Sequence, residues 1–203
     1  MITTDSQQTR AVPQPDTVND RPLRVDAQRR RDRIVAAAKE VFARQGDAVP
    51  LETIARVAGV GVGTLYRNFP NREALLEAVY AAELVMVTSN AGDLLAQLQP
   101  EEALRAWMAQ YAIFIAAKRA MLPALSAASS PGRRMTTRER VTDAIETIVA
   151  AGIETKVFRR DAHAPDIVAL LQGAFFATTQ DDGPERVTRL LDLIVDALLV
   201  DKH

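Results

Sequence analysis

Residues 51–75 constrain the fold of this chain more than any other segment, because they carry two short apolar faces on either side of a glycine. The first face has the spacing i, i+3, i+4 and i+7 of a helix and comprises Leu51, Ile54, Ala55 and Ala58. Gly59 follows, where a tight turn needs a positive φ. The second face, Leu65, Tyr66 and Phe69, stops at Pro70, which cannot continue a helix. The pattern predicts helices near 51–58 and 62–68, and therefore a helix-turn-helix.

This segment resembles the DNA-binding half of the TetR-type bacterial transcriptional repressors. The residues that carry the resemblance are Thr53, Ile54, Ala55, Ala58, Gly59, Val60, Gly63, Thr64, Leu65, Tyr66 and Phe69. The chain departs from the family pattern at Gly61, where serine is common, and at Asn68, where histidine is common. Glycine in place of a serine N-cap costs roughly a few tenths of a kcal/mol. The resemblance covers about a quarter of the chain and implies a DNA-binding regulator rather than an enzyme.

The N-terminal turn of the second short helix is the part of a helix-turn-helix that contacts base edges. We expect Gly61 and Gly63 to let the backbone approach DNA closely, because they carry no side chain. Val62, Thr64 and Arg67 are then the predicted readers, since a methyl group can touch a thymine methyl and an arginine can bridge guanine. A phosphate contact is an equally good interpretation of Arg67.

Other predicted DNA contacts are to the phosphate backbone. The resemblance implies that Tyr66 donates its hydroxyl to a phosphate while its ring packs on the domain; the alternative is a plain core tyrosine. Thr53, Asn71 and Arg72 lie at predicted helix starts, which favour anions. Residues 1–72 contain 12 Lys and Arg against 8 Asp and Glu, a net charge of +4, whereas residues 73–203 contain 13 against 18, a net charge of −5. The basic excess thus accompanies the helix-turn-helix.

The rest of the chain predicts an all-α protein with two helical parts. We assign 1–25 to a disordered tail, which is either solvated or an arm along DNA, 26–72 to a three-helix DNA-binding domain, and 73–203 to a larger C-terminal ligand-binding and dimerisation bundle. The first helix is expected at about 26–45 and the fourth from Asn71, a good N-cap, to about Asn90. Further helices are expected at about 101–119, 121–128, 133–151, 166–180 and 184–200.

The C-terminal part contains an aromatic and methionine stripe whose members are usually core residues. The resemblance implies a small apolar or amphipathic effector, and we expect it to contact Trp107, Met108, Tyr111, Phe114, Met121 and Phe175. The helices at 166–180 and 184–200 carry apolar residues on more than one face, which predicts a homodimer through the last two helices and a palindromic operator on double-stranded DNA. A cluster of Arg133, Arg134, Arg138 and Arg140 reads as a solvated face, with anion capture as the alternative.

No catalytic or cofactor motif emerges from the sequence. Cysteine is absent and the two histidines, His163 and His203, lack metal-ligand spacing to each other. No apolar run approaches the roughly 18 residues of a membrane span, which leaves the cytoplasm as the expected location. We therefore expect no catalytic residues, no metal, no cofactor and no membrane partner. The alternatives to a ligand-released repressor are a ligand-independent activator or architectural protein and, less favoured, a small helical enzyme or adaptor.

Overall fold

The computed structural model describes the backbone of residues 20–46, 48–125, 131–178 and 182–200, and the side chains of these residues except 20–24, 119–125 and 131–136. The described residues form helices and no β-strand, which confirms the predicted all-α class. The helices are α1 (Asp20–Gln45), α2 (Leu51–Val57), α3 (Val62–Asn68), α4 (Arg72–Ser89), α5 (Ala91–Leu95), α6 (Pro100–Leu125), α7 (Pro131–Glu154), α8 (Ala164–Phe176) and α9 (Pro184–Asp196).

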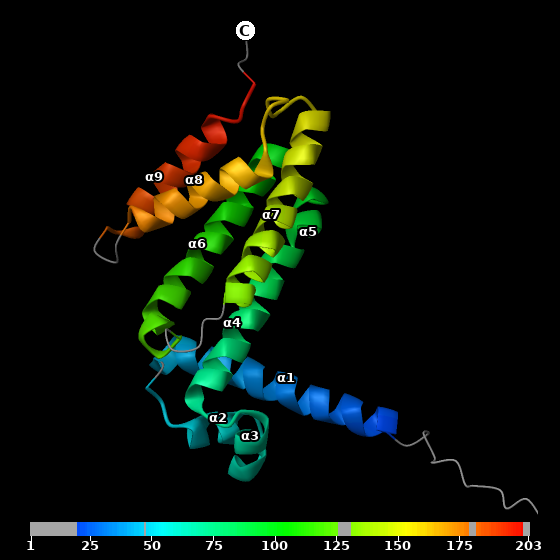
Figure 1. The fold of residues 1–203 in the computed structure, drawn as a ribbon, viewed down its shortest axis with the longest axis vertical. Coiled ribbons are helices and arrows are strands. Elements are labelled where there is room, and N and C mark those ends of the chain that lie inside the picture. The colour runs from blue at the N-terminus through cyan, green and yellow to red at the C-terminus, as the bar shows by residue number, and fades with distance from the viewer. Residues whose placement is uncertain (1–19, 47, 126–130, 179–181, 201–203) are drawn as a thin grey trace, which may run out of the picture.

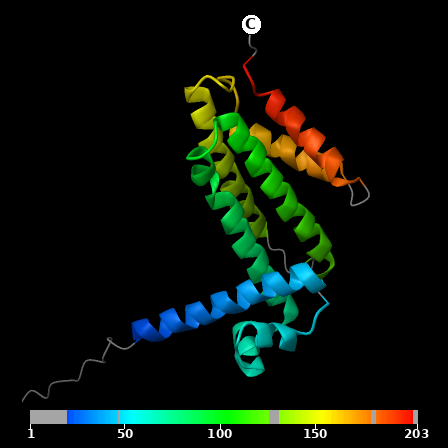
Figure 2. The same ribbon diagram turned by 180° about the vertical axis from the view of Figure 1, so that it is seen from behind.

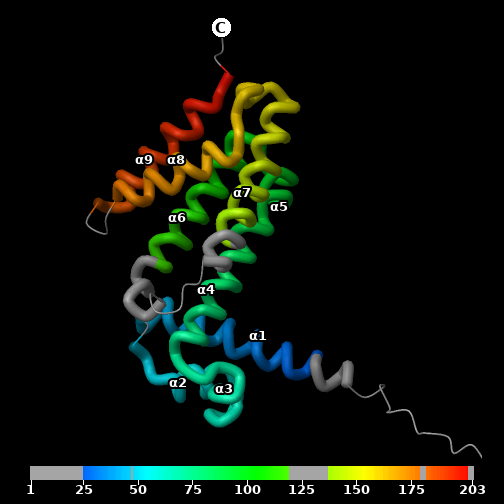
Figure 3. The backbone as a smooth tube through the Cα atoms, viewed as in Figure 1, coloured from blue at the N-terminus to red at the C-terminus, as the bar shows by residue number. Residues whose placement is uncertain are grey.

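Two separate hydrophobic cores lie along the chain, and α4 belongs to both. The first core contains residues of α1, α2 and α3 and the start of α4 up to Val79, and we call this part the N-terminal head. The second begins at Leu84 and continues through α6, α7, α8 and α9, and we call this part the C-terminal body. Figures 1 and 2 show α1 crossing the lower end of α4, with the body above. In Figure 3, α2 and α3 lie at the end of the molecule farthest from the C-terminus.

Several helix boundaries differ from those expected. Helix α1 begins at Asp20, so residues 20–25, which we had assigned to the tail, are helical, and residues 1–19 lie outside the described residues. Helix α5 was not expected at Gly92. The expected break between 119 and 121 is wrong, because α6 continues past Pro123 to Leu125. A proline so close to a helix end interrupts little of the hydrogen-bond ladder.

The connection between α7 and α8 is held in place by close packing against α7 and by pairing with the segment that follows α9. A Cβ at Gly152 would lie 2.0 Å from the ring of Phe158, so only glycine fits at this position of α7. Lys156 in the turn has φ 61°, a left-handed conformation that non-glycine residues adopt at a cost. Phe158 forms an antiparallel bridge with Leu199, which fastens the turn to the segment after α9.

One stretch, Arg72–Leu95, is long and apolar enough by length and composition alone to cross a membrane. The core helix of a soluble protein passes the same test. Here the apolar residues of α4 are divided between the two cores, with Leu75, Leu76 and Val79 in the head and Leu84 and Val87 in the body. These contacts account for the buried apolar residues of α4, while Val85 and Met86 stay exposed.

Candidate DNA-binding surface

The turn between α2 and α3 has the geometry that its glycine predicts. Gly59 has φ +65°, and it follows the C-cap residue Ala58. The N–H of Gly59 donates to the carbonyl of Arg56, and the N–H of Val60 donates to the carbonyl of Ala55 at 3.0 Å. These two bonds form a Schellman motif, which closes α2 and fixes the direction in which α3 begins.

Helix α3 has two stripes that lie side by side, about 60° apart around the helix axis, each made of residues four apart. Leu65 and Phe69 are buried in the core of the head, as expected. Val62 and Tyr66 are 40% and 43% exposed. Since these two large apolar side chains are exposed and α3 lies at the tip of the molecule (Figure 3), they form a surface that a partner can touch.

The glycines and polar residues of α3 complete this surface. Gly61 is the N-cap of α3 and supplies no side-chain cap, as expected from its place in the family pattern. Gly61 and Gly63 are both exposed, and Thr64 is half-buried. The Arg67 Nε donates to the carbonyl of Gly63 at 3.1 Å, so the guanidinium lies back along α3 toward its N-terminus. Asn68 donates to the carbonyl of Thr64 at 2.8 Å.

Arg31 of α1 braces the end of α3, a role that sequence reasoning missed. Its Nη1 donates to the carbonyl of Asn68 at 3.1 Å, and its guanidinium lies 4.3 Å from the centre of the Phe69 ring. The hydrogen bond satisfies a carbonyl at the C-terminus of α3 and the ring contact is a cation–π interaction. Arg31 is one of several arginines of α1, and its partner Asn68 is 37 residues away in the sequence. No local sequence pattern could therefore show which of these arginines contacts α3.

The three residues predicted at helix starts lie in different environments. Thr53 is half-buried in the first turn of α2. Asn71 caps α4, where its side-chain oxygen accepts from the N–H of Ala74 at 2.8 Å, which confirms the predicted N-cap. Arg72 donates to the carbonyl of Val49 at 2.6 Å and so ties the start of α4 to the loop before α2.

The residues predicted to contact an effector form an aromatic cluster in the body. Trp107 and Tyr111 stack with ring centres 5.2 Å apart, and Phe114 and Phe175 lie 5.7 Å and 5.8 Å from Tyr111. Burial, with the nearby Tyr80 as a smaller cause, raises the pKa of Tyr111. In the described structure the Nε1–H of the buried Trp107 has no hydrogen-bond partner.

The structure gives side-chain positions for only some of the other residues singled out in the body. Met108 is buried in the same core and also lines a groove on the neighbouring side of α6, whereas the side chain of Met121 lies outside the described residues, as do those of Arg133 and Arg134. Arg138 and Arg140 are exposed.

Among the described residues no group of three His, Cys, Asp or Glu side chains could hold a metal ion.

Helices α8 and α9 leave large apolar side chains on the surface. Phe176 is 92% exposed, Leu193 63% and Leu170 54%. Their neighbours on the same helices, such as Leu171, Phe175 and Leu191, are buried in the body. Figures 1 and 2 show the two helices side by side along one flank of the body, away from the head. An apolar surface of this kind is typical of an interaction site.

A short glycine-hinged helix pair braced by a third helix, with an exposed recognition helix at one end of a helical body, defines a helix-turn-helix DNA-binding protein. The family model of bacterial regulatory proteins of the TetR family matches residues 34–79, and that of the C-terminal domain of SbtR-like transcriptional regulators matches residues 99–200. The chain belongs to the TetR family of transcriptional regulators. As a member of this family it is a DNA-binding regulator and not an enzyme.

Solved structures of the family cover most of the chain. A TetR transcriptional regulator from Streptomyces coelicolor is 39% identical, with 83% of this chain and 98% of that chain covered and a TM-score of 0.67. A TetR regulatory protein from Mycobacterium vanbaalenii is 34% identical, with 88% and 100% covered and a TM-score of 0.64. The HTH-type transcriptional regulator UidR of Escherichia coli is 34% identical over 58 residues, which span 28% of this chain and only 30% of UidR.

Proposed function

We propose that this regulator is a homodimeric repressor that binds a palindromic operator and is released by a small apolar or amphipathic effector. Regulators of this family bind DNA and act as dimers with small-molecule effectors. The observation that carries the proposal is the exposed Val62–Tyr66 stripe of α3, which lies beside the buried Leu65–Phe69 stripe. A helix that is anchored in the core by one stripe and exposes the neighbouring stripe is suited to enter a major groove. The protein would act in the cytoplasm.

Direct readout falls to the N-terminal half of α3. Val62 and Thr64 offer methyl groups to thymine, and the exposed Gly61 and Gly63 permit a close approach of the backbone. Arg67 must leave the carbonyl of Gly63 to reach a guanine or a phosphate, which is a small change because that hydrogen bond is exposed.

Phosphate contacts fall to the residues around the recognition helix. Tyr66 is exposed on α3, and Thr53 lies in the first turn of α2. Asn71 and Arg72 stand at the start of α4, where the helix dipole favours an anion. Both side chains also hold backbone groups of the head, so their contacts would position the head on DNA as well as bind it.

The dimer forms through α8 and α9, whose exposed apolar residues would be covered by the same helices of a second copy. A two-fold axis makes such an interface self-complementary. It also sets the two recognition helices about 34 Å apart, one turn of DNA, and this spacing requires a palindromic site.

The effector binds beside the aromatic cluster, where the unpartnered Trp107 N–H offers a donor to a ligand acceptor. Helix α4 connects this region to the head. Its Tyr80 stacks on Phe114 at 5.0 Å, and its Glu83 pairs with Lys39 of α1 at 2.6 Å. A ligand that displaces Phe114 would therefore move α4, and the head would move with it.

The test is operator binding by Tyr66→Phe and Arg67→Ala, using duplexes selected from a random pool. Loss of a hydrogen bond to a charged phosphate costs about 1.5–3 kcal/mol, so each variant is expected to bind about tenfold or more weakly. Arg160→Ala, which removes an exposed arginine of the body, serves as the control and should bind normally. Normal binding by both Tyr66→Phe and Arg67→Ala, with the dimer intact, would show that α3 is not the reading element.

A further inference from the structure

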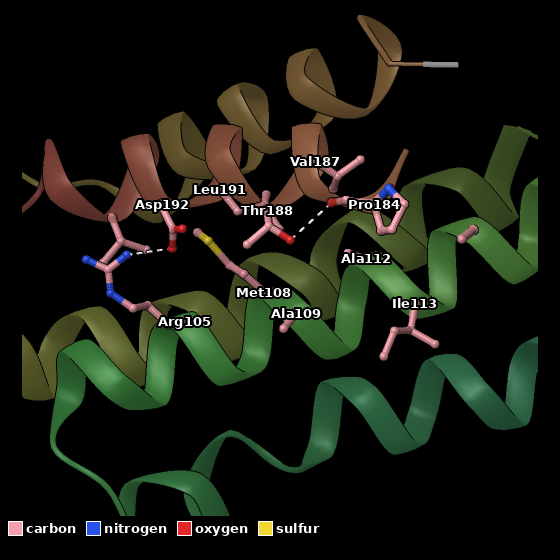
Figure 4. Close-up of a pocket in the computed structure, with 12 residues that line it drawn as sticks. Arg105, Met108, Ala109, Ala112, Ile113, Pro184, Val187, Thr188, Leu191 and Asp192 are labelled. Carbon is pink, nitrogen blue, oxygen red and sulfur yellow. Dashed lines mark hydrogen bonds and ion pairs between the residues drawn. The ribbon is translucent and has the colours of Figure 1, made fainter. Parts of the chain in front are cut away.

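A groove with a volume of about 330 Å³ runs between α6 and α9 (Figure 4). Small side chains of α6 open it, namely Ala109, Ala112 and Ala116, and Val187 and Leu191 of α9 form much of the opposite wall. Pockets for small molecules have volumes of about 300–1,000 Å³ and are mostly apolar. The groove therefore has the size and the lining of a site for a small ligand.

This groove is separate from the aromatic cluster of the proposed effector site. Successive residues of a helix are about 100° apart, which places Ala109, Ala112 and Ala116 on the side of α6 opposite Trp107 and Tyr111. Met108 lies between the two faces: it is buried in the body core and also lines the groove. A ligand in the groove would contact α6 from outside the core, so the inference goes beyond the proposed function.

One end of the groove is polar, and its chemistry is defined by Arg105. This side chain donates from Nη1 to Asp192 at 2.7 Å, from Nη2 to Asp196, and from Nε and Nη2 to Glu101 at 3.3 Å and 3.1 Å. Figure 4 shows Arg105 and Asp192 together at this end, with Pro184 and Ile113 toward the other.

The charges at this end do not balance. Three carboxylates surround one guanidinium, which leaves an excess of two negative charges. A guanidinium has five N–H donors, and the bonds to its three partners engage four of them. Asp192 and Asp196 each contact Arg105 through one oxygen, and a carboxylate oxygen that is not engaged by Arg105 can accept from another donor. An incoming anion would meet an occupied arginine, whereas an incoming cation would meet available carboxylate oxygens.

We propose that the groove between α6 and α9 binds a small amphipathic cation, an amine or quaternary ammonium carrying an apolar tail. The ammonium group lies beside Asp192, and the tail lies along Ala109, Ala112 and Ala116 against α9. The polar end fixes the orientation of the ligand, and burial of the tail in the groove supplies the affinity.

The test uses three eight-carbon probes that differ in head group: octylammonium, octanoate and 1-octanol. Each is titrated into the full chain at neutral pH and followed by calorimetry and by the fluorescence of Trp107. Trp107 is the single tryptophan of the chain and is adjacent to Met108 of the groove. Octylammonium is expected to bind saturably and at least about fivefold more tightly than the other two, since one favourable charge contact at a partly exposed site is worth about 1 kcal/mol.

Two kinds of variant locate the binding. Ala112→Leu and, independently, Ala116→Leu fill the groove and should weaken octylammonium binding about tenfold or more, while circular dichroism checks that each variant folds. Asp192→Asn should weaken octylammonium about threefold and leave 1-octanol unchanged. Asp143→Asn, which alters an exposed carboxylate of α7 outside the groove, is the control and should have no effect.

The proposal is overturned by tighter binding of octanoate than of octylammonium, by the absence of saturable binding of any probe, or by binding that both alanine variants leave unchanged. Octylammonium binding that weakens as the protein concentration rises would also overturn it, because a second copy of the chain would then occupy the groove. None of these results depends on operator binding, so failure here is distinguishable from failure of the proposed repressor function.

Discussion

The N-terminal head and the C-terminal body differ in what they leave on the surface. In the head the large apolar side chains that remain exposed are valines and one tyrosine, and two of them, Val62 and Tyr66, lie on the recognition helix. In the body they include Phe176, Leu193 and Leu170 on α8 and α9, and Ile113 on α6. The head thus has a complete core of its own and an exposed surface suited to DNA. The exposed apolar area of the body is suited to a second copy of the chain.

The head and the body should also differ in stability, because their two cores are separate and share only α4. A change confined to one core should then alter the unfolding of that part more than the other. The following substitutions test this separation and the surfaces that each part exposes, from the largest expected effect to the smallest.

Gly152→Ala should cost the body about 3 kcal/mol, because the added Cβ would overlap the buried ring of Phe158 and overpacking is expensive. Trp107 fluorescence follows unfolding of the body, and amide hydrogen exchange follows the head separately. Gly92→Ala, where a Cβ meets nothing within 4 Å, should leave the stability unchanged or slightly higher. Equal loss of protection in α1–α3 and in α6–α9 would show that the two cores unfold as one.

Phe176→Asp should weaken the dimer by about 2 kcal/mol, roughly thirtyfold in dissociation constant, since a large aromatic side chain would be replaced by a charge at the proposed interface. Sedimentation over a range of protein concentrations measures the shift. Met86→Asp changes another exposed apolar residue of the chain, on α4, and should leave the association intact. If the two variants behaved alike, the contact between copies would have to lie elsewhere.

Arg31→Leu should lower the stability of the head by about 1.5 kcal/mol, because it removes a hydrogen bond to Asn68 and a cation–π contact with Phe69. The effect should appear as faster hydrogen exchange in α3 with an unchanged Trp107 melting curve. Arg30→Leu, an exposed neighbour on α1, is the control for stability. An unaltered α3 in Arg31→Leu would mean that the brace contributes nothing.

Lys156→Gly should stabilise the body by about 1 kcal/mol, since glycine adopts φ 61° without the cost that lysine incurs. Thermal unfolding followed at Trp107 gives the sign. Arg160→Gly in the same connection should instead destabilise slightly, because glycine increases the entropy of the unfolded chain. A loss of stability in Lys156→Gly would indicate that the lysine side chain holds the turn.

Sequence patterns predicted well those elements whose conformation depends only on residues close by in the sequence. The limits of α3, the turn at Gly59 and the N-cap at Asn71 each depend on side chains within one or two helical turns. The prediction erred at Pro123 and at the start of α1. At Pro123 the helix continues past the breaking residue, and at Asp20 it begins within a segment whose local composition suggested a tail. In both places the boundary depends on the longer helix as well as on the local residues.

The amino-acid sequence by itself determined the class of this protein, because the period of apolar residues, one glycine and one proline are sufficient to specify a helix-turn-helix. Only the tertiary structure decided which arginine braces α3 and which face of α6 is open. Arg105 lies 87 and 91 residues from Asp192 and Asp196, and Arg31 lies 37 residues from Asn68. Contacts of this kind depend on how helices cross in space, and helical periodicity gives the face of each helix but not the neighbour that the face will meet.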